Sequence, residues 1–334
     1  MFVVRENSLN ESDSRAEQLC RQSMARAGFA FGDAPATFHW SQLVNPAGDK
    51  KAAIAAYEAL LLEEPENKSA LEGLAFIYQT LGNVEQASKY RRSLREVEAK
   101  AIGLDVQAHP EAVSFLLAKT GEAPQPDRVP SAYVQAHFDQ YADGFDSQLC
   151  EQLKYQAHLL VEEECNRIVS ENGSKDGLSV LDIGCGTGLT GQAIHQLFSI
   201  IDGVDLSEKM LGVAAEKNVY SNLKNANYQE YLATCDKSYN VVTASDVLIY
   251  EGDLKDTLLF VRKALKNEGH FIFTVEKGYT ETYCLRNTGR FQHNHEYIID
   301  LARDCGFKVE ISKEVKLRVN DGQAVIGYLF TLRK

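Results

Sequence analysis

The stretch Val180–Gly188, which reads VLDIGCGTG, decides the fold of this 334-residue chain. It begins as an apolar run, becomes acidic at Asp182, and then contains three closely spaced glycines: Gly184, Gly186 and Gly188. Glycine has no Cβ, so the backbone can turn tightly here and approach a ligand closely. Apolar residues then recur at helical spacing over residues 189–198. The stretch therefore predicts a strand, a glycine loop and a helix.

Such a unit is Rossmann-like and is typical of an adenosine-containing cofactor site, for which two cofactors compete. Residues 186–191 fit the G-x-G-x-x-G string of NAD sites, in which the first glycine follows the strand directly and the pyrophosphate lies on the helix N-terminus. Here Gly184 and Cys185 precede that string, and the strand ends in Asp182. A carboxylate repels a pyrophosphate, whereas it suits the ammonium group of S-adenosylmethionine. The position of the glycines relative to the end of the strand therefore favours S-adenosylmethionine over NAD.

A second acidic strand end follows about 17 residues after the glycine loop. The run 200–206 is apolar and carries Asp205, whose carboxylate is placed to accept both ribose hydroxyls of either cofactor. We expect Leu206 and Met210 to lie next to the adenine. Residues 225–232 should contain the third strand and its exit loop, with Asn227 and Tyr228 at the adenine edge.

Residues 239–248 read as a buried fourth strand that leaves Ser245 and Asp246 at its carboxyl end, where open α/β sheets bind ligands. A fifth strand is predicted over 271–275. The runs 307–319 and 324–332 flank a hairpin-type turn at Asn320–Gly322. A terminal antiparallel strand pair of this kind counts against the NAD interpretation.

An aromatic segment, residues 133–146, precedes the glycine loop. We expect its rings to close over the cofactor and exclude water, with Tyr141 in direct contact and Tyr133 next. The acidic residues of this segment, at 139, 143 and 146, are expected to form a solvated face.

The first third of the chain has a different pattern, with helical periodicity over residues 48–104. Leu71, Leu74 and Tyr78 fall at the offsets of a tetratricopeptide repeat, with half of another repeat before them. Such repeats stack to bury a core, so this pair must pack on a protein partner, a second copy or the catalytic domain. The predicted division is an N-terminal extension (1–47), a tetratricopeptide-like segment (48–105), a short helix and linker (106–130), and the α/β domain (131–334).

Composition restricts the partners. A formal charge of −12 without a dense basic run argues against a nucleic-acid substrate. No apolar run approaches the about 18 residues of a membrane helix. The seven cysteines show neither paired spacing nor a zinc pattern, so we expect no metal site and a cytoplasmic protein with free thiols.

Together these parts resemble a mostly bacterial family of class I S-adenosylmethionine-dependent methyltransferases with an N-terminal tetratricopeptide segment. The resemblance covers roughly residues 50–334 and rests on the strings FDQYADGFD, VLDIGCGTG, SDVLIYEGDL, GRFQHNHEYI and VIGYLF. It implies a Rossmann-like sheet closed by an antiparallel hairpin and preceded by a small all-α segment. It also implies S-adenosylmethionine as cofactor, with S-adenosylhomocysteine as product.

The implied reaction is in-line methyl transfer to an oxygen or nitrogen of a small molecule or a peptide, which a general base assists. Candidate bases are His293, Asp246 and Tyr250, with His295 as a further histidine. An Asp/Asn-Pro-Pro-Tyr string is absent at 245–248, which disfavours methylation of adenine N6 or a glutamine amide. Two alternatives stay open: an inactive assembly protein of the same fold, and an NAD-dependent oxidoreductase.

Overall fold

The computed structural model describes residues 50–142, 144–320 and 322–334. The predicted N-terminal extension, residues 1–47, lies outside this part of the chain. The chain divides into two compact units, one ending at Ala101 and the other beginning at Ile102.

In the described part of the first unit, the helices are α2 (Lys50–Glu63), α3 (Lys68–Thr80) and α4 (Val84–Ala101). The side chain of Asn67 caps α3 by accepting a hydrogen bond from the backbone N–H of Ala70 at 3.0 Å. The ring of Tyr57 in α2 packs against α3 so closely that a Cβ at Gly73 would lie 2.6 Å from it. A glycine at this position therefore allows α2 and α3 to approach closely.

The second unit is built on one sheet, and nine strands of the described residues belong to it. The parallel strands are β3 (Asn222–Asn225), β2 (Ile200–Asp205), β1 (Ser179–Ile183), β4 (Tyr239–Ala244) and β5 (Leu265–Lys277), in that spatial order. The antiparallel pair β8 (Lys308–Asn320) and β9 (Gln323–Arg333) continues the sheet, with β9 next to β5. Two short strands, β6 (Tyr283–Leu285) and β7 (Phe291–His293), pair near the end of β5. The strand order reverses between β1 and β4, which is where open α/β sheets form a ligand crevice.

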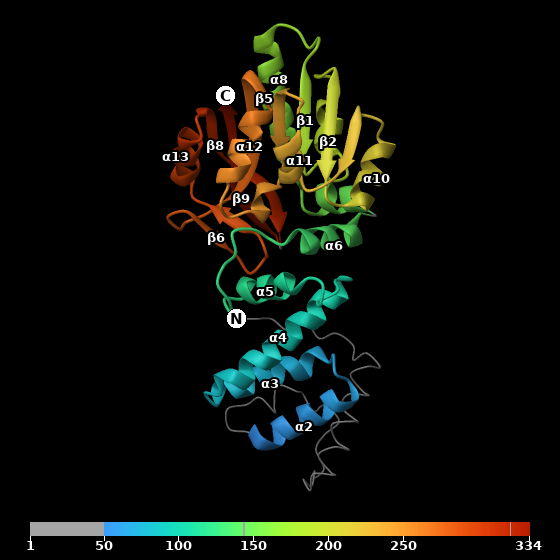
Figure 1. Cartoon of the computed structure of the whole chain (residues 1–334), viewed down its shortest axis with the longest axis vertical. Helices are drawn as coiled ribbons and strands as arrows, with labels where there is room; N and C mark the ends of the chain where they lie inside the picture. The colour runs from blue at the N-terminus through green and yellow to red at the C-terminus, as the bar shows by residue number, and fades with distance from the viewer. Residues whose placement is uncertain (1–49, 143, 321) are drawn as a thin grey trace. The chain divides into compact units, whose positions relative to one another are not determined.

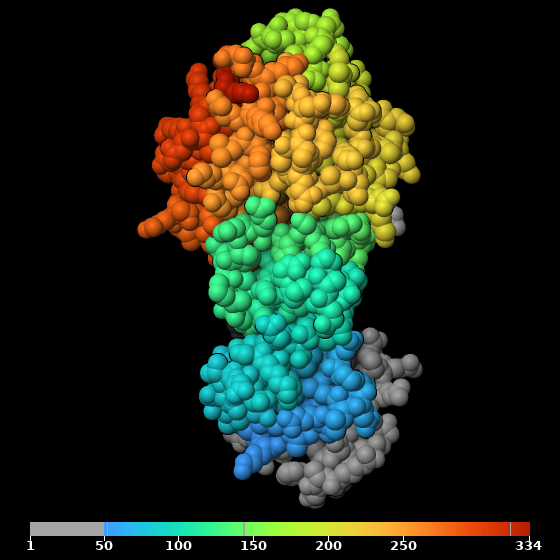
Figure 2. All heavy atoms as spheres, viewed as in Figure 1, coloured from blue at the N-terminus to red at the C-terminus, as the bar shows by residue number. Residues whose placement is uncertain are grey.

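The helices of this unit are α5 (Pro110–Lys119), α6 (Ser131–Tyr141), α7 (Phe145–Ser147), α8 (Ala157–Asn172), α9 (Leu189–Ile194), α10 (Glu208–Glu216), α11 (Tyr228–Thr234), α12 (Lys255–Ala264) and α13 (His295–Asp304). A π-helical turn (Gln148–Gln152) and a 3₁₀ turn (Leu248–Tyr250) complete it. Helix α6 crosses below the arrowheads of the parallel strands, at their carboxyl ends (Figure 1). In the space-filling view its green surface meets the yellow surface of the sheet region along this edge (Figure 2).

Side-chain alternation along the strands explains why helices cover both faces of the sheet. In β1, Val180 belongs to the core under α8 and α9, whereas Leu181 belongs to the core under α11, α12 and α13. Ile272 and Phe273 of β5 divide in the same way. Because successive strand residues point to opposite faces, apolar runs of this kind require cover on both sides.

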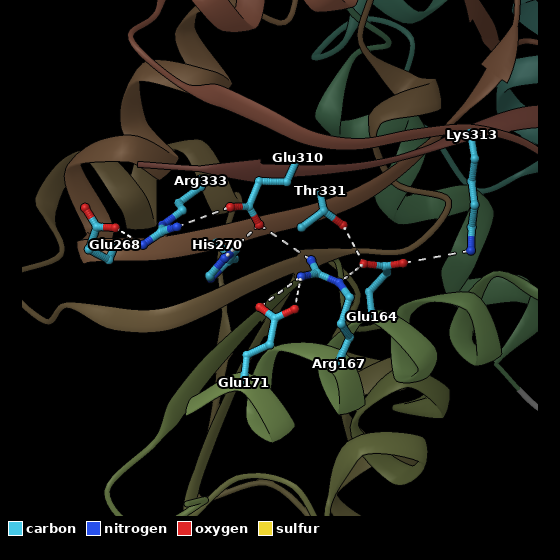
Figure 3. Close-up of polar contacts among 9 residues, drawn as sticks. All are labelled: Glu164, Arg167, Glu171, Glu268, His270, Glu310, Lys313, Thr331 and Arg333. Atoms are coloured by element: carbon cyan, nitrogen blue, oxygen red, sulfur yellow. Dashed lines mark hydrogen bonds and ion pairs between the residues drawn. The ribbon is translucent and has the colours of Figure 1, made fainter. Parts of the chain in front are cut away.

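Polar contacts also bind α8 to the closing hairpin (Figure 3). The buried carboxylate of Glu164 accepts hydrogen bonds from Arg167 at 3.0 Å and from Thr331 at 3.2 Å. Glu310 of β8 lies between Arg333 and His270, at 3.4 and 3.2 Å. Glu310 also lies 3.6 Å from Arg167, so α8 contacts β8 through Glu310 and β9 through Thr331, more than a hundred residues later in the chain.

The predicted strands at 200–206, 239–248 and 271–275 and the two hairpin runs correspond to β2, β4, β5, β8 and β9. The predicted position of the third strand was wrong. β3 occupies Asn222–Asn225, and most of the predicted range 225–232 is loop and helix α11. The side-chain oxygen of Asn227 accepts from the N–H of Gln229 at 2.8 Å and begins this helix. β3 is an edge strand with mostly exposed residues, so it carries no apolar run.

Candidate functional site

A cavity of about 340 Å³ lies at the carboxyl ends of the parallel strands, where β1 and β4 separate. Its size is within the range of small-molecule sites. It brings together most of the predicted site residues: Tyr141, Gly184, Cys185, Gly186, Asp205, Leu206, Met210, Asn227, Tyr228, Ser245, Asp246 and Tyr250. Four others lie elsewhere: Tyr133, Asp182, Gly188 and His293.

The glycine loop after β1 requires glycine for two separate reasons. Gly184 has a φ of +62°, and a Cβ there would lie 2.5 Å from the Val247 side chain. Gly186 also has a positive φ, of +53°, but a Cβ there would meet nothing within 4 Å. The backbone at Gly186 is therefore exposed to the cavity without a side chain in the way.

Asp205, at the end of β2, connects this loop to the next one. One carboxylate oxygen accepts from the N–H of Gly186 at 2.8 Å, and the other accepts from the N–H of Ser207 at 2.8 Å. Burial raises the pKa of Asp205, and the two backbone hydrogen bonds oppose that effect. Each oxygen keeps a second lone pair that can accept a hydroxyl of a ligand.

Asp182 does not line the cavity, which corrects the expectation that it binds an ammonium group there. It is 1% exposed, and its two oxygens accept from the hydroxyls of Tyr220 and Thr243 at 2.8 Å each. Burial raises the pKa of Asp182 to about 6, against the lowering effect of these two hydrogen bonds. The carboxylate of Asp182 therefore connects the end of β1, just before the glycine loop, to Tyr220 and Thr243. The ring of Tyr220 also lies 2.9 Å from where a Cβ of Gly188 would be.

Leu206, Met210 and Asn227 line the cavity near the ends of β2 and β3. Met210 is 1% exposed, so it is largely core and offers the cavity only a small apolar surface. The side-chain oxygen of Asn227 already caps α11, and its amide N–H donates to Ser131 at 3.0 Å. Asn227 therefore fixes the start of α6 against α11.

Helix α6 closes the cavity with aromatic rings. Phe138 contacts Tyr250 edge to face, with ring centroids 5.7 Å apart, and both line the cavity. Tyr141 is 42% exposed and lies at the cavity as well. Tyr133 instead packs on Phe115 of α5, with centroids 4.9 Å apart, because it lies two turns earlier on α6. Its predicted cofactor contact is not seen in this arrangement.

Two acids of the aromatic segment do not form the solvated face that the sequence predicted. Asp139 accepts a hydrogen bond from Ser207, which follows β2. Asp146 accepts from Thr187 of the glycine loop and pairs with Lys217 at 2.6 Å. The third acid, at position 143, lies outside the described residues. Asp139 and Asp146 therefore attach the aromatic segment to both loops of the cavity.

The candidate bases differ in whether they lie at the cavity. Asp246 and Tyr250 line the cavity, whereas His293 is fully buried in β7 and its Nε2 lies 3.0 Å from the carbonyl oxygen of Gly252. Burial lowers the pKa of His293 to about 4. A buried imidazole away from the cavity cannot serve as its base, so we correct this assignment. His295 does not line the cavity either and contacts Ser312.

One cavity residue was missed altogether. Arg318, in β8, is 1% exposed and pairs with Asp246 at 2.6 Å and with Glu276. The three residues come from the ends of β4, β5 and β8. The sequence gives no signal for it, because every second residue over 308–318 is polar and Arg318 therefore resembles a residue of a solvated strand face.

Among the residues that the structure describes, no group of three or more acidic, histidine or cysteine side chains could hold a metal ion. In the same part of the chain, no helix has the length and apolar character needed to cross a membrane.

Comparison with known proteins agrees with this geometry. Residues 181–271, from β1 to β5, match a family described as a methyltransferase domain. The parallel sheet, its reversal between β1 and β4, and this match define a Rossmann-like methyltransferase fold.

Curated relatives are similar over part of the chain. The ubiquinone biosynthesis O-methyltransferase of Thiobacillus denitrificans is 29% identical over 130 residues, which is 37% of this chain and 53% of that protein. An uncharacterized protein of Methanocaldococcus jannaschii is 30% identical over 155 residues, 46% of this chain and 56% of the relative. The chain thus spans about half the length of these relatives.

Among solved structures, the magnesium protoporphyrin IX methyltransferase of Synechocystis is similar, with a TM-score of 0.48 and 18% identity. The similarity covers 64% of this chain and 99% of that one.

Proposed function

We propose that this chain is an S-adenosylmethionine-dependent methyltransferase that acts on an oxygen or nitrogen of its acceptor. One observation carries the proposal. The carboxylate of Asp205 is fixed by the N–H groups of Gly186 and Ser207, beside a loop whose glycine backbone is open to the cavity. A ribose with both hydroxyls free fits this carboxylate, and the methyltransferase-domain match over 181–271 supports the choice of cofactor.

The cavity residues have distinct roles in this proposal. Asp205 holds the ribose, and Leu206, Met210 and Tyr228 contact the adenine. Ser245 and the backbone of residues 184–186 lie along the methionine end, where the carboxyl ends of β1 and β4 separate.

Bound S-adenosylmethionine would supply a methyl group on a positively charged sulfur, so no acid is needed for the leaving group. The aromatic rings of α6 exclude water. The contact of Asp139 holds α6 at the site, and the contact of Asp146 holds the following helix, α7. Positioning in a dry site is the main requirement of such a transfer.

The acceptor is proposed to be a small molecule or a peptide. The T. denitrificans relative is by name an O-methyltransferase, which supports an oxygen acceptor for this chain. The location in the cytoplasm stays a prediction.

The test is a calorimetric titration of the purified chain with S-adenosylmethionine, S-adenosylhomocysteine and NAD. We expect both sulfur nucleosides to bind and NAD not to bind. Binding of NAD alone would instead favour an oxidoreductase, and the absence of all binding would favour an inactive assembly protein. Transfer of a labelled methyl group into fractionated lysate then identifies the acceptor.

We further propose that α2, α3 and α4 form a tetratricopeptide-like unit that binds a protein partner, an acceptor peptide or a second copy. Leu62 and Val84 of this unit are 85% and 72% exposed, so both aliphatic side chains are accessible to a partner. Light scattering of the full chain and of a Leu62→Ser/Val84→Ser variant tests self-association. Concentration-dependent growth in mass that the variant lacks would support a second copy.

A further inference from the structure

Asp246 combines a strained backbone with an unpaired carboxylate oxygen. It has a φ of +60°, which residues other than glycine rarely adopt, and its N–H donates to Thr274 at 2.9 Å. Its Oδ2 accepts from Arg318 at 2.6 Å. Its Oδ1 is buried and has no hydrogen-bond partner among the described residues. Strained residues of this kind are retained where the surroundings hold them for a function.

The surroundings of Asp246 have an uneven charge. Arg318 carries one positive charge and contacts two carboxylates, those of Asp246 and Glu276. When both acids are ionised the group therefore carries one net negative charge. Glu276 is 5% exposed, so Arg318 and Glu276 form a buried neutral pair. The uncompensated charge belongs to Asp246, the member of the group that keeps a free oxygen.

We propose that Oδ1 of Asp246 is the catalytic base that accepts the proton of the methyl acceptor, and that Arg318 and Glu276 are the residues that position it. This inference rests on the proposed function. The acceptor is then a hydroxyl or an amine that carries a proton. The acceptor lone pair forms a bond to the methyl carbon, the carbon–sulfur bond breaks with its electrons going to sulfur, and the acceptor proton moves to Asp246.

The sheet order places Asp246 at the appropriate end of the cavity. With the ribose at Asp205 on β2 and the adenine toward β3, the sulfur lies over β1 and β4, and Asp246 follows β4. The net negative charge disfavours an acceptor whose nucleophilic atom is an anionic carboxylate. Protonation of Asp246 leaves the Arg318–Glu276 pair neutral, so the charge of the group falls to zero as the positive sulfur becomes a neutral thioether.

The other titratable groups around Asp246 do not take its role. Tyr155 is 7% exposed, and burial raises its pKa well above the usual value, so it stays neutral. Tyr250 lies beside Arg318 and lines the cavity. Both oxygens of Asp182 accept hydrogen bonds from hydroxyl groups, those of Tyr220 and Thr243, and Asp182 does not line the cavity. Asp246 is the carboxylate of this group that has an unpaired oxygen among the described residues.

The experiment uses two probes, sinefungin and S-adenosylhomocysteine, because it needs no knowledge of the acceptor. Sinefungin carries an amine where the cofactor carries its methyl group, so it places a charged N–H donor next to the acceptor position, where a base can accept from it. Titration calorimetry gives the ratio of the two dissociation constants. For the wild-type chain we expect sinefungin to bind about tenfold or more tightly than S-adenosylhomocysteine, the effect of one charge-assisted hydrogen bond.

Asp246→Asn is the first variant. Asparagine tolerates a positive φ, so the backbone is kept while the charge is lost. We expect the sinefungin preference to fall about tenfold with S-adenosylhomocysteine affinity unchanged. An unchanged preference overturns the proposal. Equal weakening of both probes also overturns it, since Asp246 would then bind the methionine ammonium that the probes share. Asp202→Asn, a buried carboxylate away from the cavity, is the control and should leave the ratio unchanged.

The positioning role has its own variants. Arg318→Lys keeps the positive charge but cannot contact Asp246 and Glu276 at the same time. We expect the ratio of the two dissociation constants to fall several-fold in this variant. Arg318→Met/Glu276→Leu removes a neutral pair, so Glu276 is not left as an unpaired buried charge, and Asp246 loses the side chain that orients it. This double variant should lose the preference as well, while it still binds S-adenosylhomocysteine. Retention of the full preference by the double variant would show that Asp246 needs no positioning.

Failure of this inference differs from failure of the proposed function. If the wild-type chain binds neither probe, the proposed function fails. If it binds both probes and the variants behave as wild type, only the role of Asp246 fails.

Discussion

Replacement of Asp205 by alanine should weaken nucleoside binding in a measurable and specific way. Each carboxylate oxygen accepts one backbone N–H at 2.8 Å and keeps one lone pair for a ribose hydroxyl. The variant loses these hydroxyl contacts and also leaves the N–H groups of Gly186 and Ser207 without their acceptor. Hydrogen bonds to a charged group contribute about 1.5–3 kcal/mol each, part of which water replaces. We therefore expect a loss of about 1–3 kcal/mol in binding free energy, which corresponds to a rise in Kd of roughly 5- to 150-fold.

The assay is calorimetric titration with S-adenosylhomocysteine and with its 2′-deoxyribose analogue. The wild-type chain should prefer the parent nucleoside, and Asp205→Ala should discriminate between the two much less. Asp202→Asn is the matched control on the same strand, because Asp202 pairs with Lys237 and Asn222 and does not line the cavity. An unchanged Kd for Asp205→Ala, or the same discrimination between the two ligands, would refute the ribose assignment.

Three further predictions concern the loop and the aromatic segment. The pKa of Asp182 is raised from 3.8 to about 6 by burial, so its protonation stabilises the fold at low pH and this contribution is lost as the pH rises to about 6. In chemical denaturation, the free energy of unfolding of Asp182→Asn should rise relative to wild type as the pH increases from 3.8 to about 6, by up to about 3 kcal/mol. A difference that does not change with pH would contradict this. Gly184→Ala should lower the melting temperature and abolish cofactor binding, since a Cβ would lie 2.5 Å from Val247 at a φ of +62°; wild-type behaviour would show that the loop can shift. Asp146→Asn weakens the contact with Lys217, so stopped-flow measurements should show a nucleoside dissociation rate several-fold faster, and an unchanged rate would argue that the segment is held by its rings alone.

The sequence was most informative where burial shapes it. β1, β2, β4, β5 and most of β9 are apolar runs because helices or further strands cover them, and each was predicted near its observed position. The edge strand β3 has the sequence Asn-Leu-Lys-Asn with little burial, so it has no such signal. Asn227, which follows this strand, was predicted to meet the adenine; it lines the cavity, and its side chain begins helix α11.

The site was predictable only in part, for a related reason. Glycine spacing and strand-end acids revealed the loop and Asp205, because both depend on local sequence. The partners of a side chain depend on contacts between distant residues. Asp182 is occupied by Tyr220 and Thr243, and Arg318 reaches Asp246 across 72 positions. His293 stood out as a histidine in a motif, yet the fold buries it away from the cavity.

The most direct measurement is a crystal structure of the full chain with S-adenosylhomocysteine. We predict that its ribose hydroxyls lie within hydrogen-bond distance of Asp205 and that its sulfur faces the end of β4. A nucleoside bound elsewhere on the chain, with the cavity empty, would contradict the cofactor site.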